Sequence, residues 1–187
     1  MRQSALLLLL LLPATCFSHI SFRENTHLSR VLLTKTPTSM NHGTIVKEKN
    51  RPYYYIQVNQ KWINQSYALL KPYLKAHHQT CFHQPTDLDG QAHITLLTQY
   101  SAALQPYLGK TIRFRPLKVE QFIATVKRHH LNVQHHWYVV AVNLQNPPLN
   151  RLLQKLHPDV KMTYHISFAV AKYNAQGQCI LPKTIQS

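Results

Sequence analysis

The sequence predicts an α+β protein with two pseudo-symmetric lobes, each an antiparallel sheet with helices, that face each other across a central cleft. Two observations lead to this prediction. The order strand, helix, loop, strand occurs twice, over residues 53–98 and again over residues 137–171. The last strand of each copy carries a histidine and a hydroxyl residue two positions apart. Such a two-lobed protein would present one histidine strand from each lobe to the cleft.

Residues 1–18 have the features of a secretory signal peptide: a basic start, seven consecutive leucines and then small residues. Cleavage after Cys16 and cleavage after Ser18 both fit, and lipid attachment at Cys16 is an alternative. The leucine stretch is too short to span a bilayer, and no other segment is apolar enough to do so. We therefore expect a secreted or periplasmic protein with no stable membrane insertion after cleavage.

Residues 19–51 are polar and contain turn-forming residues and a charged run, which predicts an irregular arm or linker. The folded domain is expected to cover residues 52–187, long enough to bury a core. Alternating or continuous apolar runs predict its strands, and apolar residues at helical spacing predict its helices. The predicted strands are 53–58, 92–98, 111–114, 119–127, 137–144 and 162–171, and the predicted helices are 62–77 and 149–156.

The chain is strongly basic, with a formal net charge of +15 and only six acidic residues. This charge favours a polyanionic partner such as a nucleotide or a nucleic acid, although a basic secreted protein without such a partner is also common. Several functional classes lack their motifs. The chain contains no Gly-x-Ser-x-Gly elbow, no His-Glu-x-x-His, no Cys-x-x-Cys and no glycine-rich phosphate loop. Its histidine doublets would point to opposite sides of a strand, so no metal site is predicted.

Two triplets stand out among the 13 histidines: His93-Ile94-Thr95 and His165-Ile166-Ser167. Other His-x-Ser/Thr triplets lie in polar or helix-like segments, whereas these two lie in strand-like apolar runs. Residues two apart on a strand point to the same face, so each run places an imidazole beside a hydroxyl while its isoleucine points into the core. Ordinary, partly buried histidines are the alternative interpretation.

Two histidines and two hydroxyls suit acid–base chemistry on a phosphodiester, and that chemistry needs neither a metal nor another cofactor. Histidine serves as both acid and base because its ordinary pKa lies near neutral pH. Arg113 and Arg115, two apart on a predicted strand, share a face and are the best candidates for binding the substrate phosphate. The three tyrosines at 53–55 suit either strand packing or stacking on a base.

The two triplets resemble the paired His-x-Thr/Ser motifs of the 2H phosphoesterase superfamily, and the finer likeness is to the bacterial secreted group of Swiss-army-knife RNA-repair-like proteins. This resemblance implies a two-lobed fold and hydrolysis of 2′,3′-cyclic phosphates or related RNA-derived phosphodiesters. It implies that His93 and His165 are the catalytic pair, one as base and the other as acid. It also implies that Thr95 and Ser167 donate hydrogen bonds to the phosphate oxygens, where charge builds in the transition state. A nucleotide or an RNA end would then be the substrate.

Two further alternatives remain open at this point. Cys81 and Cys179 either form a disulfide, as an oxidising compartment favours, or are two separate buried thiols. The domain itself is either an enzyme or a non-catalytic secreted module whose basic surface binds nucleic acid or a host partner. A degenerate relative that binds a ligand without turning it over is a third possibility.

Overall fold

The computed structural model describes residues 17–35, 41–49, 51–85, 92–128, 131–156 and 164–180. Strands are the commonest element in this part of the chain. The elements are, in order, β1 (Phe17–Glu24), α1 (Thr26–Lys35), β2 (His42–Lys47), β3 (Tyr54–Val58), α2 (Lys61–Ala76), β4 (His93–Leu97), η4 (Ala102–Tyr107), β5 (Thr111–Arg128), β6 (Leu131–Leu144), α3 (Pro147–Leu156) and β7 (Tyr164–Tyr173).

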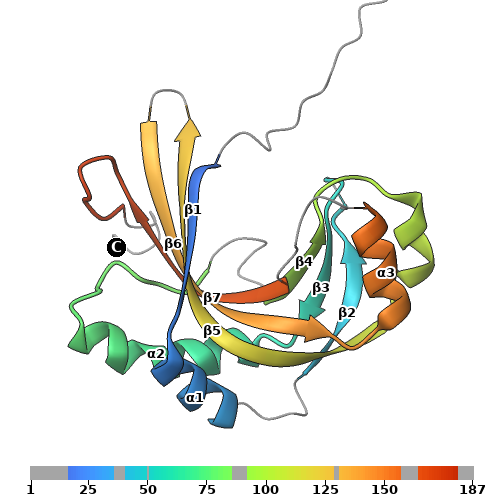
Figure 1. The fold of residues 1–187 in the computed structure, drawn as a ribbon, viewed down its shortest axis with the longest axis horizontal. Helices are drawn as coiled ribbons and strands as arrows, with labels where there is room; N and C mark the ends of the chain where they lie inside the picture. The colour runs from blue at the N-terminus through green and yellow to red at the C-terminus, as the bar shows by residue number, and fades with distance from the viewer. Residues whose placement is uncertain are drawn as a thin grey trace, which may run out of the picture.

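The strands form a closed antiparallel barrel of six strands, β5-β2-β3-β4-β7-β6, which β5 closes by also pairing with β6. The 18-residue β5 pairs with β2 at its start and with β6 along most of its remaining length. The seventh strand, β1, pairs with β5 outside this ring. Figure 1 shows the long strands β5 and β6 curving from the β1 side of the molecule to the β2 side. Closure pairs strands that would otherwise be edges.

One row of branched aliphatic side chains crosses all six barrel strands, from β2 to β5, and explains their register. Neighbours in this row are cross-strand partners, and each is at most 1 % exposed. The row consists of Ile45, Ile56, Ile94, Ile166, Val140 and Val119. A shift of one residue in any strand would turn the aliphatic side chain of that strand out of the core. Burial of the row therefore fixes which residues point to the opposite face of the sheet.

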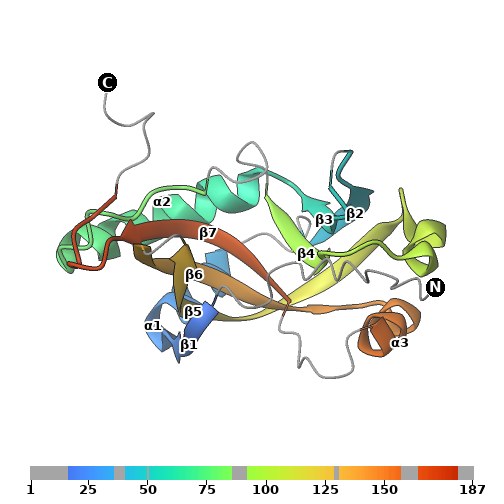
Figure 2. The same cartoon turned by 90° about the horizontal axis from the view of Figure 1, so that it is seen from above.

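Helices α1 and α2 pack against the sheet. Helix α2 follows the apolar spacing of its sequence, with Trp62, Ile63, Leu70 and Leu74 buried in the core. It contacts β7, and Figure 2 shows it lying above that strand. Helix α1 contacts both β5 and α2, so that α1 and α2 lie together at the end of the molecule away from α3 (Figure 1). The sequence prediction for residues 62–77 is therefore confirmed within one residue at each end.

The predicted two-lobed arrangement is wrong. The two copies of the strand–helix–strand order do not form facing lobes, because their histidine strands, β4 and β7, are neighbours in a single closed sheet. The reason lies in β5, which was expected to be two short strands at residues 111–114 and 119–127. Pro116 instead sits at a shift in the β5–β6 register, and the strand continues through it. A long curved strand can join both halves into one barrel.

The expected irregular arm at residues 19–51 is also wrong in its local structure. This segment contains most of β1 and all of α1 and β2, and Ser29 of α1 bonds to the backbone of Val119 in β5 through its hydroxyl. Polar composition misled the prediction because edge elements bury only a few apolar side chains, here Leu28 and Leu32 in α1. Residues 1–16 of the expected signal peptide lie outside the described residues, and β1 begins at Phe17.

Candidate functional site

The two histidine motifs lie side by side on one face of the barrel wall. Ile94 of β4 is the direct antiparallel partner of Ile166 of β7, and both are fully buried. The residues that flank each isoleucine therefore point to the opposite face. One step along the ladder in either direction places His93 across from Ser167, and Thr95 across from His165. All four of these side chains are partly exposed.

This register places the two imidazoles within reach of one small ligand. Residues directly opposite in an antiparallel pair have Cβ atoms about 5 Å apart, and diagonal neighbours are about 7–8 Å apart. His93 and His165 are diagonal neighbours, and each lies opposite the hydroxyl residue of the other motif. The arrangement is thus nearly symmetric, with one imidazole and one hydroxyl at each end of a four-residue patch. A phosphate group is small enough to contact both ends.

Strands β3, β6 and β5 extend this face on both sides. Gln57 pairs with His93, and Tyr55 pairs with Thr95. On the other side, Val139 and Ala141 pair with Ser167 and His165, and then with Glu120 and Lys118. Lys118 and Glu120 form an ion pair at 2.7 Å, in which the carboxylate side chain is 8 % exposed and the lysine side chain 40 % exposed. A buried acid and a half-exposed cation therefore share the face with the histidines.

Aromatic rings surround the two imidazoles. The rings of Tyr53 and Tyr55 meet the His93 ring edge-on, with centroids 6.2 and 5.8 Å from it. The Phe122 ring lies 6.4 Å from that of His165. Edge-on contacts of this kind restrict ring rotation and favour one orientation of the side chain. The tyrosines thus act at least in part by packing against the candidate site.

The Thr95 hydroxyl is hydrogen-bonded to the Tyr53 hydroxyl, and either oxygen can be the donor. A hydroxyl donates one hydrogen bond and accepts two. When Tyr53 is the donor, the proton of Thr95 remains available for an oxygen of a bound ligand. Sequence reasoning considered Tyr53 only for packing or base stacking, and its position two residues from Tyr55 was the only available signal for this contact.

Arg113 and Arg115, the predicted phosphate-binding pair, lie exposed on one face of β5. Arg113 pairs with His42 of β2 and Arg115 with Asn143 of β6, so the register does not bring either arginine against the histidines. Lys118 is the basic residue in the same row as His165. Sequence reasoning missed both Lys118 and Glu120, because their relation to the histidines depends on pairing between distant strands.

Tyr164 precedes His165 but does not offer a second acid or base near neutral pH. It is partly buried, and this burial raises the pKa of its phenol to about 12. Its position beside His165 in the strand also directs it to the other face, as the alternation of the sequence predicts. The phenol therefore stays protonated at any physiological pH.

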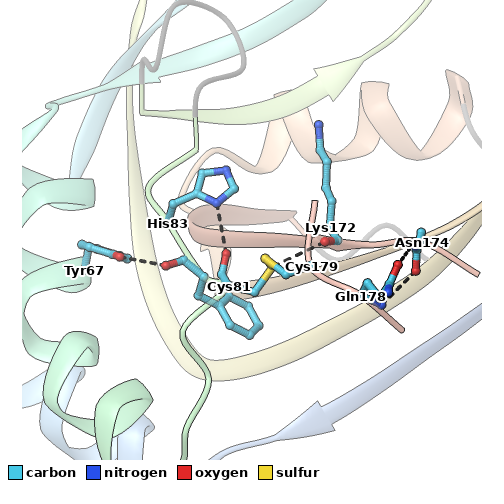
Figure 3. Close-up of a disulfide and its surroundings, with 8 residues drawn as sticks. Tyr67, Cys81, His83, Lys172, Asn174, Gln178 and Cys179 are labelled. Atoms are coloured by element: carbon cyan, nitrogen blue, oxygen red, sulfur yellow. Dashed lines mark hydrogen bonds between the residues drawn. A yellow bond between two sulfur atoms is a disulfide. The ribbon is translucent and has the colours of Figure 1, made fainter. Parts of the chain in front are cut away.

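The structure contains the disulfide between Cys81 and Cys179, with their Cα atoms 5.7 Å apart. Figure 3 shows the bond between the segment that follows α2 and the segment that follows β7. Backbone hydrogen bonds surround it, since His83 pairs with Val170 in β7 and Tyr173 pairs with Cys179. The bond thus anchors the C-terminal part of β7, and the alternative of two separate thiols is wrong.

Comparisons with protein-family models, with curated proteins and with solved structures found no match to this chain. Among the described residues, no three His, Cys, Asp or Glu side chains lie close enough together to hold a metal ion. No helix in the same part of the chain has the length and apolar character needed to cross a membrane.

Proposed function

We propose that this chain is a metal-independent phosphoesterase that hydrolyses 2′,3′-cyclic phosphates or related RNA-derived phosphodiesters, with His93 and His165 as its acid–base pair. The observation that carries the proposal is the pairing of Ile94 with Ile166, which places both imidazoles on one face of neighbouring strands. The likeness to 2H phosphoesterases now rests on the two motifs alone, because the barrel is not their two-lobed architecture. The net positive charge of the chain supports an anionic substrate.

The proposed reaction adds one water to the cyclic phosphate. A neutral imidazole takes a proton from water as its oxygen attacks phosphorus, and the bond from phosphorus to one ribose oxygen breaks. The second imidazole, protonated, gives its proton to that departing oxygen, so the product is a phosphomonoester. The nearly symmetric patch lets either histidine take either role. Each imidazole has the hydroxyl of Thr95 or Ser167 opposite it to hold the non-bridging oxygens.

The test is turnover of 2′,3′-cyclic nucleotides by the purified, disulfide-bonded protein, measured with and without a chelator. His93→Ala and His165→Ala should each lower kcat by roughly 10²–10⁴-fold, the usual effect of removing one general acid or base. Chelation should leave the wild-type rate unchanged. A pH–rate profile should have two limbs in the wild type and lose one limb in each variant.

His78→Asn is a matched control for these variants. His78 is exposed after α2 and has a φ of 55°, a conformation that asparagine tolerates. This variant removes one histidine that lies outside the strands of the patch and should keep the wild-type rate. Circular dichroism spectra of all three variants are the check that each variant is folded. Turnover that persists in both active-site variants would exclude the mechanism.

A second candidate function is binding of single-stranded nucleic acid without catalysis. The observation that favours it is a pair of lysines that cover tyrosine rings beside β2. The Lys47 ammonium lies 5.4 Å from the Tyr100 ring, which is 62 % exposed, and the Lys110 ammonium lies 5.3 Å from the Tyr107 ring. Tyr107 is partly buried, so Tyr100 is the ring available to a base, and aromatic rings next to cations are the elements with which proteins stack bases and hold phosphates. RNA binding that survives loss of both His93 and His165, in a protein without turnover, would favour this candidate.

An exported location is part of the proposal. The disulfide is compatible with an oxidising compartment, where such bonds form and persist. A protein made in the reducing cytosol, with its thiols free, would lack this link between the C-terminal segment and the barrel.

A further inference from the structure

A polar pocket of about 470 Å³ lies on the opposite face of the sheet from the histidine patch. Its floor is a cross-strand row of Arg23 in β1, Gln121 in β5 and Tyr138 in β6. Gln121 and Tyr138 adjoin Glu120 and Val139 in sequence, and those neighbours belong to the histidine face. Because successive side chains of a strand point to opposite faces, the pocket and the patch are separate sites.

The walls of the pocket come from the start of α1 and the C-terminal end of α2, which Figure 1 shows next to each other. Hydrogen bonds hold these walls in place. The side-chain amide of Asn25 donates to the Tyr73 hydroxyl at 3.1 Å, and the Tyr138 hydroxyl donates to Oε1 of Gln79 at 3.0 Å. Burial raises the pKa of Tyr138, so its phenol keeps the proton that this bond requires. The pocket is therefore formed before any ligand binds.

The chemistry of the lining selects for an anion. Arg23, His27 and His77 contribute nitrogen donors, and none of the described residues that line the pocket is a carboxylate. Among the described residues, no ion pair occupies the Arg23 guanidinium. A guanidinium presents planar paired donors that match two oxygens of a phosphate. The remaining lining is mostly amide and hydroxyl groups, which suit a ligand body rich in hydroxyls and do not suit an apolar one.

We propose that this pocket binds a small phosphorylated metabolite with a hydroxyl-rich body, of the class of sugar phosphates and nucleoside monophosphates. Arg23 and His77 hold the phosphate, while Gln79 and Gln121 hydrogen-bond to the hydroxyls of the body. The volume is within the range of ordinary small-molecule sites. This site is independent of the proposed phosphoesterase function, because it uses neither His93 nor His165.

The test is calorimetric titration of the full disulfide-bonded protein that carries His93→Ala and His165→Ala, so that the histidine patch does not contribute its imidazoles. The probes are ribose 5-phosphate, adenosine monophosphate, inorganic phosphate and unphosphorylated adenosine, all at one ionic strength. Both phosphate esters should bind saturably, inorganic phosphate more weakly, and adenosine not at all. Added on this background, Arg23→Gln should weaken binding of the esters at least about tenfold, the usual effect of losing charge-assisted hydrogen bonds.

His77→Gln is a second variant that should weaken binding in the same direction, and it serves if Arg23→Gln fails to fold. Arg151→Gln, at an exposed position on α3, is the matched control and should bind as tightly as the parent protein. The proposal is overturned if neither ester binds saturably. It is equally overturned if Arg151→Gln weakens binding as much as Arg23→Gln, because the attraction would then be that of the basic chain in general.

Discussion

The single residues of the histidine patch owe their positions to the isoleucines beside them. Ile94 and Ile166 are fully buried partners, and burying two such side chains contributes several kcal/mol, or about 1.5–3 kcal/mol each. Any slip of β4 or β7 by one residue would bury His93 or His165 and expose an isoleucine. The residues that fix the geometry of the proposed chemistry are therefore apolar residues that take no part in it.

His136 in β6 is a residue whose titration should be visible in the stability of the protein. Burial lowers the pKa of this imidazole in the folded state, and its ring packs against that of Tyr173 at 4.8 Å. The unfolded chain therefore binds a proton at a pH where folded His136 does not, and stability falls as pH drops below the ordinary histidine range. The protein loses no stability through His136 above the pKa of histidine in the unfolded chain, which is near 6.5.

We expect the midpoint of thermal unfolding to fall as the pH is lowered from about 7.5 to about 5, with His136→Gln showing a shallower fall than the wild type. The difference between the two profiles isolates His136 from the other 12 histidines. Parallel profiles would mean that folding does not disfavour the charged form of this side chain.

Among the elements, β7 carries the second motif and is held at its far end by the disulfide. Cys81 and Cys179 are 98 residues apart in sequence, so the bond restricts a large loop in the unfolded chain. The segment that contains Cys81 also pairs with β7 through an isolated backbone bridge between His83 and Val170. The disulfide and this short bridge together attach the C-terminal segment to the barrel.

The double variant Cys81→Ala/Cys179→Ala should lose about 4–5 kcal/mol of unfolding free energy, the value that chain entropy predicts for a loop of this length. Urea denaturation measures the loss. A reductant should produce a similar loss in the wild type and no change in the double variant. A loss below about 1 kcal/mol would show that the unfolded chain is little constrained by the bond.

At the scale of the whole molecule, the excess of positive charge governs the long-range attraction of the protein to anionic partners. It does not determine the fold. A formal charge of +15 should give binding to single-stranded RNA that weakens steeply with salt, because each neutralised phosphate releases counterions. We expect Lys47→Gln and Lys110→Gln each to lower the slope of log K against log salt by about 0.7. Fluorescence anisotropy with a labelled oligonucleotide measures the slopes. A slope near zero for the wild type would rule out phosphate contacts as the source of binding.

Much of the local structure could be predicted from the sequence. Helix α2, helix α3 and strands β3, β4 and β7 were expected within a few residues, because their apolar spacing is strong. The irregular arm was wrong, since β1 and α1 lie at the edge of the sheet, where tertiary contacts rather than spacing stabilise them. Strand β5 was predicted as two strands, 111–114 and 119–127, whereas pairing with β6 continues across the gap between them.

The sequence alone was sufficient to place each imidazole beside a hydroxyl, because alternation along one strand is a local property of the backbone. It favoured a disulfide between Cys81 and Cys179 but left two separate thiols open, and the structure contains the disulfide. Only the tertiary structure decided that β4 lies next to β7, that Lys118 rather than Arg113 or Arg115 lies in the same cross-strand row as His165, and that the sheet closes into a barrel. These features depend on pairing between segments far apart in the chain, and the energy that selects the pairing comes from burying one row of aliphatic side chains contributed by all six barrel strands.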